Sequence, residues 1–405
     1  MTTGHLLAIA PLSLPARQVL WIAYGFLAGF VLSSQRWRKP GVSRLAAALP
    51  LLLLNLLAPL LFDGDTETLA NFSCAIATAF ISNMKLLGWI MGRGSLVSPT
   101  LSPAQFAAVY TLPITPAAEP EEEVEESNGG AEAEQPEARE GAELSQAKPQ
   151  LVRRRVPSHL AESYSTAHLL VRFLLKAAAL VWTGVTLHTI TLPRLPQLVL
   201  EVFSQHMILS ISADGLGAAA SALLGISVSR HFENPYGSTS VADFWNKRWN
   251  LVVSNVLRAC IYDPIMEGRL VTRPNASIPR FSRTRRMAAV LTVFVASGLV
   301  HEVLFWYQSG THTPHLLWFW HFVAWGCIIV AENVGKKALR KAGLRVPTLL
   351  SIALFQVLMH IMLGAFWFPP LHRMAVMEKG AASIVQGWQL LKRAAWAATA
   401  TAAAA

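Results

Sequence analysis

Long runs of apolar residues, separated by polar segments, are the main pattern in this sequence. Each run is roughly twenty residues long, the length that an α-helix needs to cross about 30 Å of hydrocarbon. A soluble amphipathic helix would interrupt such a run every third or fourth position. The pattern therefore predicts eight transmembrane helices, at 18–34, 45–62, 68–90, 166–190, 196–226, 287–307, 315–334 and 347–368. A ninth, alanine-rich run at 381–400 suits either a further span or a helix lying along the membrane surface.

The charges between the runs predict the side of the membrane that each loop occupies. Cytosolic loops carry an excess of lysine and arginine. Every second loop here is basic, whereas the loop after the second run has three acidic residues and no basic one. Eight crossings place all four basic loops on one side, which we predict to be the cytosol. Their basic residues are Arg36, Arg38, Lys39 and Arg44, then Arg153, Arg154 and Arg155, then ten residues from Arg230 to Arg286, and last Lys336, Lys337, Arg340, Lys341 and Arg345.

The composition fits a protein whose main solvent is lipid. Hydrophobic residues make up 53% of the chain and charged residues 14%, against about 25% charged residues in a soluble domain. Cys74, Cys260 and Cys327 lie far apart, with no CxxC or His-Cys spacing. We therefore predict an all-α, polytopic membrane protein of eight or nine transmembrane helices, without a disulfide framework, a metal site or a cofactor. We expect the lipid bilayer, and no nucleic acid, as its partner.

An acidic segment divides the chain. Residues 119–143 contain eleven glutamates and one arginine, a local charge of −10 in a chain whose net charge is +10. Residues 116–150 are rich in Glu, Ala, Pro and Gly and nearly free of large apolar side chains, so they cannot bury enough surface to fold. We predict a disordered cytosolic linker at 116–150 between the first three spans (1–115) and the remaining core (151–405).

His301 and Glu302 are unusual because they lie inside an apolar run. Counted from Arg286, His301 is about 22 Å into its helix. Ionisable groups at membrane depth usually face a protein interior, a cavity or a substrate path. A neutral imidazole there can accept a proton, but it can equally serve only as a hydrogen-bonding partner for a neighbouring helix. Glu302 lies about 100° further around the helix and suits the orientation of a partner group better than catalysis.

The second unusual segment, 235–263, is expected in the cytosol yet is dense in aromatic residues. Ser240 or Asp243 suits a helix N-cap. After it, apolar residues recur at helical spacing, namely Phe244, Trp245, Trp249, Val252, Val253 and Leu257. One interpretation is an amphipathic helix at the membrane surface. The other is a helix that closes the cytosolic mouth of a cavity and carries Asn250 inward.

These two segments resemble the plant wax synthase family, a branch of the membrane-bound O-acyltransferase superfamily. The resemblance rests on DFWNKRWNLVVSNVLR at 243–258 and on SGLVHE at 297–302, and it extends to NMKLLGW at 83–89 and TLPIT at 111–115. It covers most of the chain, with the motif region at 235–307. The acidic segment at 119–143 and the alanine-rich tail fall outside it.

The resemblance implies which residues form the site. His301 matches the intramembrane catalytic histidine of the family, and Asn250 matches the asparagine of the tryptophan-rich motif, with Asn246 as the competing candidate. We expect substrate contacts from the neighbours of these residues in the two motifs, namely Asp243, Trp245, Asn246, Arg248, Trp249 and Glu302.

The expected activity is acyl transfer from acyl-CoA, as co-substrate, to a long-chain alcohol in the membrane of the endoplasmic reticulum. His301 would take the proton of the alcohol, and Asn250 would stabilise the oxyanion. The CoA phosphates would dock on the basic cytosolic face, at Arg248, Arg258 and the cluster 280–286. A sterol acceptor is the nearest alternative. A transporter, whose internal repeats we do not find, and a membrane scaffold are the alternatives from other classes.

Overall fold

The computed structural model describes residues 12–117, 164–273 and 282–404, and over these residues the chain is all helical apart from one bridge of extended backbone, Pro116 to Val228. Most of the predicted acidic linker lies outside the described residues. Eight helical segments are long and apolar enough to cross a membrane, which confirms the predicted fold class. They are Leu14–Ser33, Val42–Leu61, Thr68–Met91, Thr166–Thr189, Arg194–Leu224, Arg283–Ser309, Pro314–Lys341 and Thr348–Arg373.

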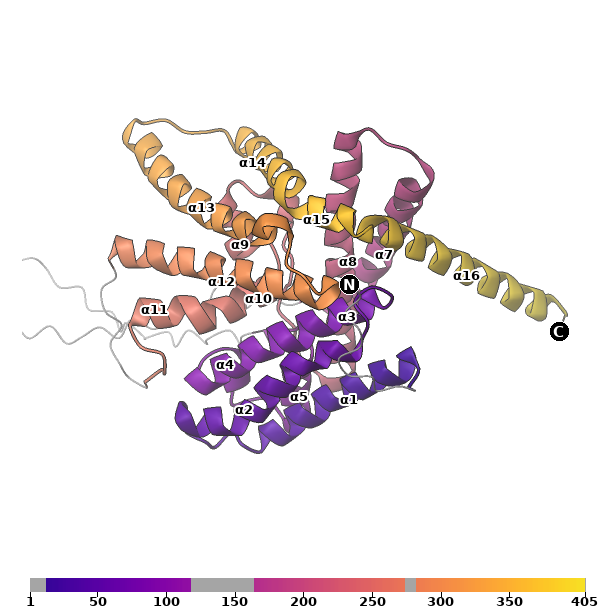
Figure 1. Cartoon of the computed structure of the whole chain (residues 1–405), viewed down its shortest axis with the longest axis horizontal. Helices are drawn as coiled ribbons and strands as arrows, with labels where there is room; N and C mark the ends of the chain where they lie inside the picture. Colours follow the sequence, from indigo (N-terminus) through magenta and orange to yellow (C-terminus); the bar gives the residue numbers. More distant parts are fainter. Residues whose placement is uncertain (1–11, 118–163, 274–281, 405) are drawn as a thin grey trace, which may run out of the picture.

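The helices form three neighbouring groups (Figure 1). The first contains α1 (Leu14–Ser33), α2 (Val42–Leu57), α3 (Thr68–Cys74), α4 (Asn83–Met91) and α5 (Pro103–Thr111). The second is the steeply inclined pair α7 (Thr166–Thr189) and α8 (Arg194–Leu224). The third contains α9 (Val241–Lys247), α10 (Leu251–Leu257), α11 (Asp263–Glu267), α12 (Arg283–Ser309), α13 (Leu317–Lys341) and α14 (Thr348–Met362).

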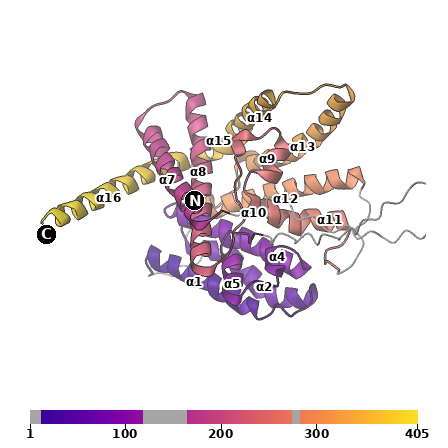
Figure 2. The same cartoon turned by 180° about the vertical axis from the view of Figure 1, so that it is seen from behind.

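The C-terminal region continues through α15 (Phe368–Arg373) into α16 (Val376–Ala404). The first turns of α16 pack against α7, where the side chain of Ile384 lies over Gly184. Further on, α16 extends away from the other helices, as Figures 1 and 2 both show. It is not among the eight segments with the hydropathy of a span. The ninth run is therefore helical, and the choice between a further span and a surface helix stays a prediction.

Three of the basic loops meet at one end of the bundle. The N–H of Gly41 donates to Ile90 O (2.7 Å) and the N–H of Thr272 to Met91 O (2.9 Å). Arg93 forms a two-pronged ion pair with Glu267, with both N–O distances 2.8 Å. These contacts join the loops after α1, α4 and α11, which we call the basic end. The loop charges therefore predicted correctly that these segments share one side.

Lys85 joins the two segments 83–89 and 111–115, which the family resemblance identified separately. Its side chain is buried in α4, and its ammonium donates to the carbonyls of Val109, Leu112 (2.6 Å) and Ile114 (2.9 Å). These carbonyls lie at the end of α5 and just after it, where a helix leaves its last carbonyls without backbone partners. Lys85 therefore holds residues 109–114 against α4.

We predict that Lys85→Met lowers the free energy of unfolding by about 2 kcal/mol or more, because it leaves the carbonyls of Val109 and Ile114 without a donor, each costing about 1–3 kcal/mol. The carbonyl of Leu112 keeps the N–H of Ile114 (2.8 Å). Thermal unfolding in detergent micelles measures the loss. Lys39→Met, at an exposed position of the same basic end, should leave the midpoint unchanged. Equal midpoints for the two variants would contradict the conclusion that Lys85 holds residues 109–114 against α4.

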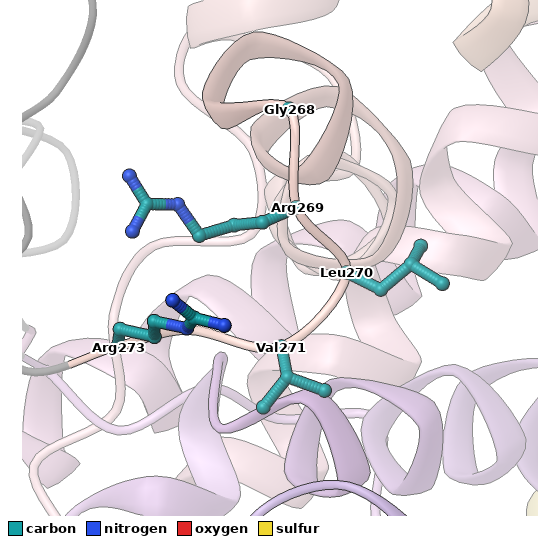
Figure 3. Close-up of a pocket in the computed structure, with 5 residues that line it drawn as sticks. All are labelled: Gly268, Arg269, Leu270, Val271 and Arg273. Atoms are coloured by element: carbon teal, nitrogen blue, oxygen red, sulfur yellow. The ribbon is translucent and has the colours of Figure 1, made fainter.

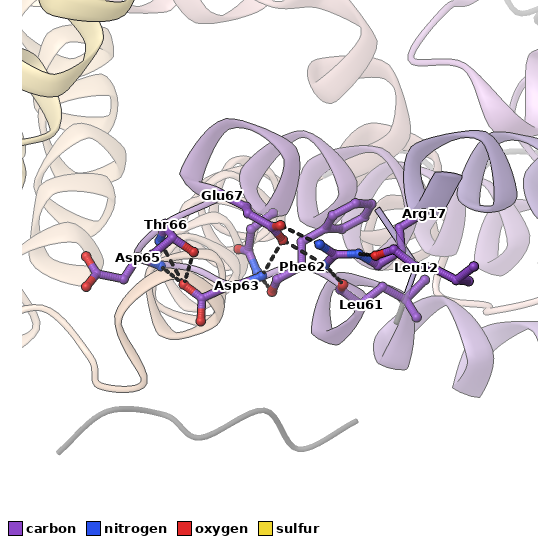
Figure 4. A network of polar contacts seen from close by, with 9 residues as sticks. Leu12, Arg17, Leu61, Phe62, Asp63, Asp65, Thr66 and Glu67 are labelled. Atoms are coloured by element: carbon purple, nitrogen blue, oxygen red, sulfur yellow. Dashed lines mark hydrogen bonds and ion pairs between the residues drawn. The ribbon is translucent and has the colours of Figure 1, made fainter. Parts of the chain in front are cut away.

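At the opposite end, Arg17 of α1 anchors the loop 62–67 (Figure 4). Its guanidinium binds both carboxylate oxygens of Glu67 (2.8 and 2.5 Å) and donates to Leu61 O (2.7 Å). The carboxylate of Glu67 also accepts the N–H of Asp63 (3.0 Å). The hydrogen bond from Arg17 is the main reason why the pKa of Glu67 lies below its usual value.

This anchor makes stability depend on pH. Because the pKa of Glu67 is lowered on folding, its contribution is fully present above the unfolded-state pKa of about 4.3 and is lost as the pH falls through the folded-state pKa. We predict that Glu67→Gln costs about 1–2 kcal/mol at pH 7 and that the two proteins converge on acidification below about pH 4. Unfolding midpoints of both proteins across this range test it; a difference independent of pH would refute it.

Candidate active site

The site around His301 is built on the α12–α13 hairpin. The two helices approach closely at Gly298, where an added Cβ would lie 2.8 Å from Phe319 O, and 3.0 Å from its Cα. No side chain fits there. The glycine of the SGLVHE motif therefore lets α13 pack against α12 one turn before His301, and it brings the aromatic residues of α13 over the imidazole.

Three aromatic rings surround the imidazole of His301. Phe322 stacks on it, with ring centroids 4.1 Å apart and an interplanar angle of 26°. Trp367 and Trp318 stand almost perpendicular to it, at 5.5 and 6.4 Å. These two indoles stack on each other at 4.4 Å. We call this set, Phe322, Trp318 and Trp367, the aromatic cage. The imidazole is thus directed into protein, and its ring is half-buried.

A backbone contact fixes the tautomer of His301. Its Nδ1 lies 2.7 Å from Ser297 O in the preceding turn of α12. A carbonyl oxygen only accepts, so Nδ1 carries the hydrogen and donates. In the neutral ring Nε2 then holds the lone pair. The atom that can take a proton therefore lies on the side of the ring away from its own helix.

Glu302 fastens the turn between the two helices. Its buried carboxylate accepts the N–H of Thr313 (2.8 Å), the hydroxyl of Thr313 (2.6 Å) and the N–H of Phe319 (3.0 Å). Thr313 precedes the short 3₁₀ helix Pro314–Leu316, and Phe319 lies in the first turn of α13, where helix N–H groups lack backbone partners. Glu302 therefore orients α13 and, through it, Trp318 and Phe322. Its predicted contact with substrate stays a prediction.

The tryptophan-rich segment forms two helices, not the single helix that the apolar spacing predicted. Ser240 caps α9 by accepting the N–H of Asp243 (3.1 Å), as expected. The chain then breaks at Asn250, whose φ of 41° and ψ of 62° are left-handed, before α10 begins. Asparagine is one of the few residues that adopt this conformation readily. The break turns α10 away from the direction of α9.

Trp245 is the residue of this segment that the structure brings nearest to His301. Its ring packs against Phe294 and Phe322, both at 5.8 Å. Since Phe322 also stacks on His301, one ring separates the two residues. Trp249 packs elsewhere, in a stack with Phe244 (5.2 Å) and beside His206 (5.6 Å).

The two candidate asparagines, Asn246 and Asn250, differ in their exposure. Asn246 is exposed and Asn250 is half-buried. Among the described residues, neither side chain forms a hydrogen bond, and no contact joins either of them to His301. The π-helical turn Arg258–Tyr262, directly after α10, packs on α12, and Val252 and Val253 of α10 belong to the same apolar cluster as Val300 and Leu304. The pairing of His301 with Asn250 stays a prediction.

Asp243 and Arg248 bind each other. The guanidinium donates to the carboxylate (2.7 Å) and to Asn234 O (3.1 Å). The carboxylate also accepts the N–H of Thr239 (3.2 Å). Both side chains thus stabilise the turn around α9, and the structure gives no evidence for or against their predicted substrate contacts.

A basic pocket of about 430 Å³ opens at the basic end (Figure 3). Arg269 and Arg273 extend from its wall, which residues 268–273 form. In the neighbouring predicted docking surface, Arg258 faces Asp263 (3.6 Å) and Arg285 donates to Ile265 O (2.7 Å), while Arg280 lies outside the described residues. From the sequence, Arg269 and Arg273 were predicted only to help set the side of the membrane on which their loop lies.

The aromatic cage was missed by the sequence analysis. Trp318, Phe322 and Trp367 lie in apolar runs, where they look like any membrane-facing ring. Only the close approach at Gly298 and the return of the chain after α14 bring them together. The glycine three residues before His301 was the one available signal.

Comparisons with known proteins agree with the motif reading. Residues 228–324, which include Asn250 and His301, match the model of the membrane bound O-acyl transferase family. Acyl-CoA–sterol O-acyltransferase 1 of Arabidopsis thaliana is 28% identical over 84% of this chain and 85% of its own length. Long-chain-alcohol O-fatty-acyltransferase of Simmondsia chinensis is 28% identical, covering 74% and 73%. Probable long-chain-alcohol O-fatty-acyltransferase 8 of A. thaliana is 26% identical, covering 75% and 74%. The similarities confirm the resemblance to the wax synthase family.

We predict that Glu302→Gln destabilises the hairpin by about 2–3 kcal/mol, because it removes a charged acceptor and turns an amide N–H₂ toward protein donors. Thermal unfolding and limited proteolysis within 310–316 measure this. Thr313→Val is the matched control: it removes one hydroxyl but keeps the backbone bond, so it should cost only about 1 kcal/mol. A Glu302→Gln protein as stable as the wild type would show that the carboxylate does not hold the turn.

Proposed function

We propose that this chain is an acyltransferase of the membrane bound O-acyl transferase family and that it moves a fatty acyl group from acyl-CoA to the hydroxyl of a long-chain alcohol, forming a wax ester. The observation that carries the proposal is the imidazole of His301. It lies inside a membrane span, within the aromatic cage, and its Nδ1–H is engaged by Ser297 O, so Nε2 is the proton acceptor.

The residues suit a direct transfer. A thioester is already activated, and no GxSxG motif is present to form an acyl-enzyme. His301 Nε2 takes the proton of the alcohol as its oxygen attacks the thioester carbonyl carbon. The tetrahedral oxyanion then collapses, the C–S bond breaks, and the CoA thiolate takes the proton back from His301. The Asn250 carboxamide is proposed to donate to the oxyanion.

The proposed routes of substrate entry follow from where the basic pocket and the lipid-facing span lie. The pocket with Arg269 and Arg273 lies at the basic end, where phosphates of CoA would find positive charge. The acyl chain and the alcohol are apolar and reach the span from lipid. Asp243, Trp245, Asn246, Arg248 and Trp249 are proposed to line the approach. We propose the endoplasmic reticulum as the membrane and the cytosol as the side of the basic end.

A sterol is the second candidate acceptor. The relative whose name gives a sterol acceptor covers 84% of this chain, against 74% for the long-chain-alcohol relative of Simmondsia chinensis, at equal identity. Both acceptors present one hydroxyl at the end of a large apolar body. The mechanism at His301 is therefore the same for both, and the choice depends on the shape of the acceptor path.

We predict that wild-type protein in microsomes forms labelled ester from acyl-CoA and a panel of long-chain alcohols and sterols, and that His301→Ala reduces the rate by about 10²–10⁴-fold, the usual contribution of a general base. His188→Ala, at an exposed position at the end of α7, should retain full activity. Undiminished ester formation by His301→Ala would remove His301 from the mechanism. A wild-type protein that esterifies none of the acceptors would favour transport or a scaffold.

A further inference from the structure

The indole N–H of Trp367 is a buried hydrogen-bond donor without an acceptor. The side chain is 8% exposed, and its Nε1 has no hydrogen-bond partner among the described residues. Buried polar groups in folded proteins are almost always paired, so an unpaired one needs an explanation. Trp318, the other indole of the same stack, shows the ordinary case: its Nε1 donates to Trp367 O at 3.0 Å.

The position of this donor suggests its use. Trp367 stands at 70° to the imidazole of His301, with centroids 5.5 Å apart. An indole nitrogen lies at the edge of its ring, so an oxygen bonded to it at about 2.9 Å would lie beside the ring that packs against the imidazole. Indole Nε1 is a donor only and never changes charge in this chemistry.

The local backbone holds Trp367 in this place. It ends a π-helical turn, Leu363–Trp367, between α14 and α15. Such turns are rare in proteins, and many of those that occur lie at functional sites. The stack with Trp318, with rings 11° from parallel, and the hydrogen bond to Trp367 O then fix the indole from one side. The donor is thus preorganised, which is the condition for stabilising charge that develops in a transition state.

We propose that Trp367 is a catalytic residue whose indole N–H donates to the carbonyl oxygen of the acyl thioester, an inference that rests on the proposed function. When the alcohol oxygen bonds to the carbonyl carbon and its proton passes to His301 Nε2, the electron pair of the C=O bond moves to that oxygen. The indole N–H donates to the resulting oxyanion until the C–S bond breaks and the thiolate leaves with the proton from His301.

Trp245 is the rival donor, since its Nε1 is also buried and without a partner among the described residues. Its ring, however, reaches His301 only through Phe322. Trp367 touches the imidazole directly. The two assignments differ in the residue at which loss of one N–H slows the reaction.

The test replaces the N–H and keeps the shape. In Trp367→3-benzothienylalanine a sulfur takes the place of the N–H, so the ring still stacks but cannot donate. We expect kcat to fall about 10²-fold or more, the cost of one oxyanion donor. Binding of an S-alkyl-CoA thioether, which has no carbonyl, should be unchanged. Trp21→3-benzothienylalanine, on α1 against Phe62, is the control for incorporation and should retain wild-type kcat.

The possible results separate this proposal from the wider one. A kcat within about twofold of wild type, whatever its effect on KM, overturns the role of Trp367 and leaves the proposed function standing. A parallel loss of thioether binding would mean that the residue only supports the fold, which also overturns it. A large loss of kcat in Trp245→3-benzothienylalanine, with none at residue 367, would assign the donor to Trp245. A wild-type protein inactive with every acyl-CoA and acceptor overturns the proposed function itself.

Discussion

The carboxylate of Glu302 closes the α12–α13 hairpin, and the geometry around His301 depends on it. Inside a span no water is available to solvate a carboxylate, so protein donors have to replace it. Glu302 takes these donors from Thr313, in the turn before α13, and from Phe319, in its first turn. The same contact therefore satisfies a buried charge and fixes the helix that carries Trp318 and Phe322. The adjacent His301 and Glu302 thus have different surroundings: the imidazole lies against the aromatic cage, and the carboxylate positions the helix that carries two of its rings.

The same constraint shapes the rest of the membrane region, where buried polar residues connect segments that are distant in sequence. Asn55 of α2 donates to Asn83 of α4 (2.8 Å) and to Tyr110 of α5 (3.0 Å). Lys85 holds the end of α5. Asp214 of α8 accepts from both Lys176 and Arg172 of α7. In lipid, packing alone gives little preference for one helix partner over another, and polar contacts of this kind add specificity.

The sequence predicted the parts of this structure that depend on local pattern. Apolar run length identified all eight spans, because burial in hydrocarbon demands twenty apolar residues in succession. Loop charge correctly grouped three of the four loops predicted to share one side, those after α1, α4 and α11. The tryptophan-rich segment was predicted less well: its spacing suggested one helix, but the left-handed Asn250 breaks it, and a single residue's backbone conformation leaves no periodic signal. The aromatic cage could not be predicted, because it joins residues of α13 and of the π-helical turn after α14 through tertiary contacts that leave no local pattern.

The cage and the histidine together suit a reaction that begins and ends with neutral groups. Thioester and alcohol enter uncharged, and charge appears only while the tetrahedral intermediate exists. A site lined by arginine or lysine would have to bury those charges permanently in the bilayer, at a cost of about 2.5–3.5 kcal/mol or more each. Aromatic rings carry no such cost, and an indole N–H offers a dipole that acts when the oxyanion forms. In the proposed reaction His301 changes its protonation, and the Ser297 carbonyl fixes in advance which nitrogen does so.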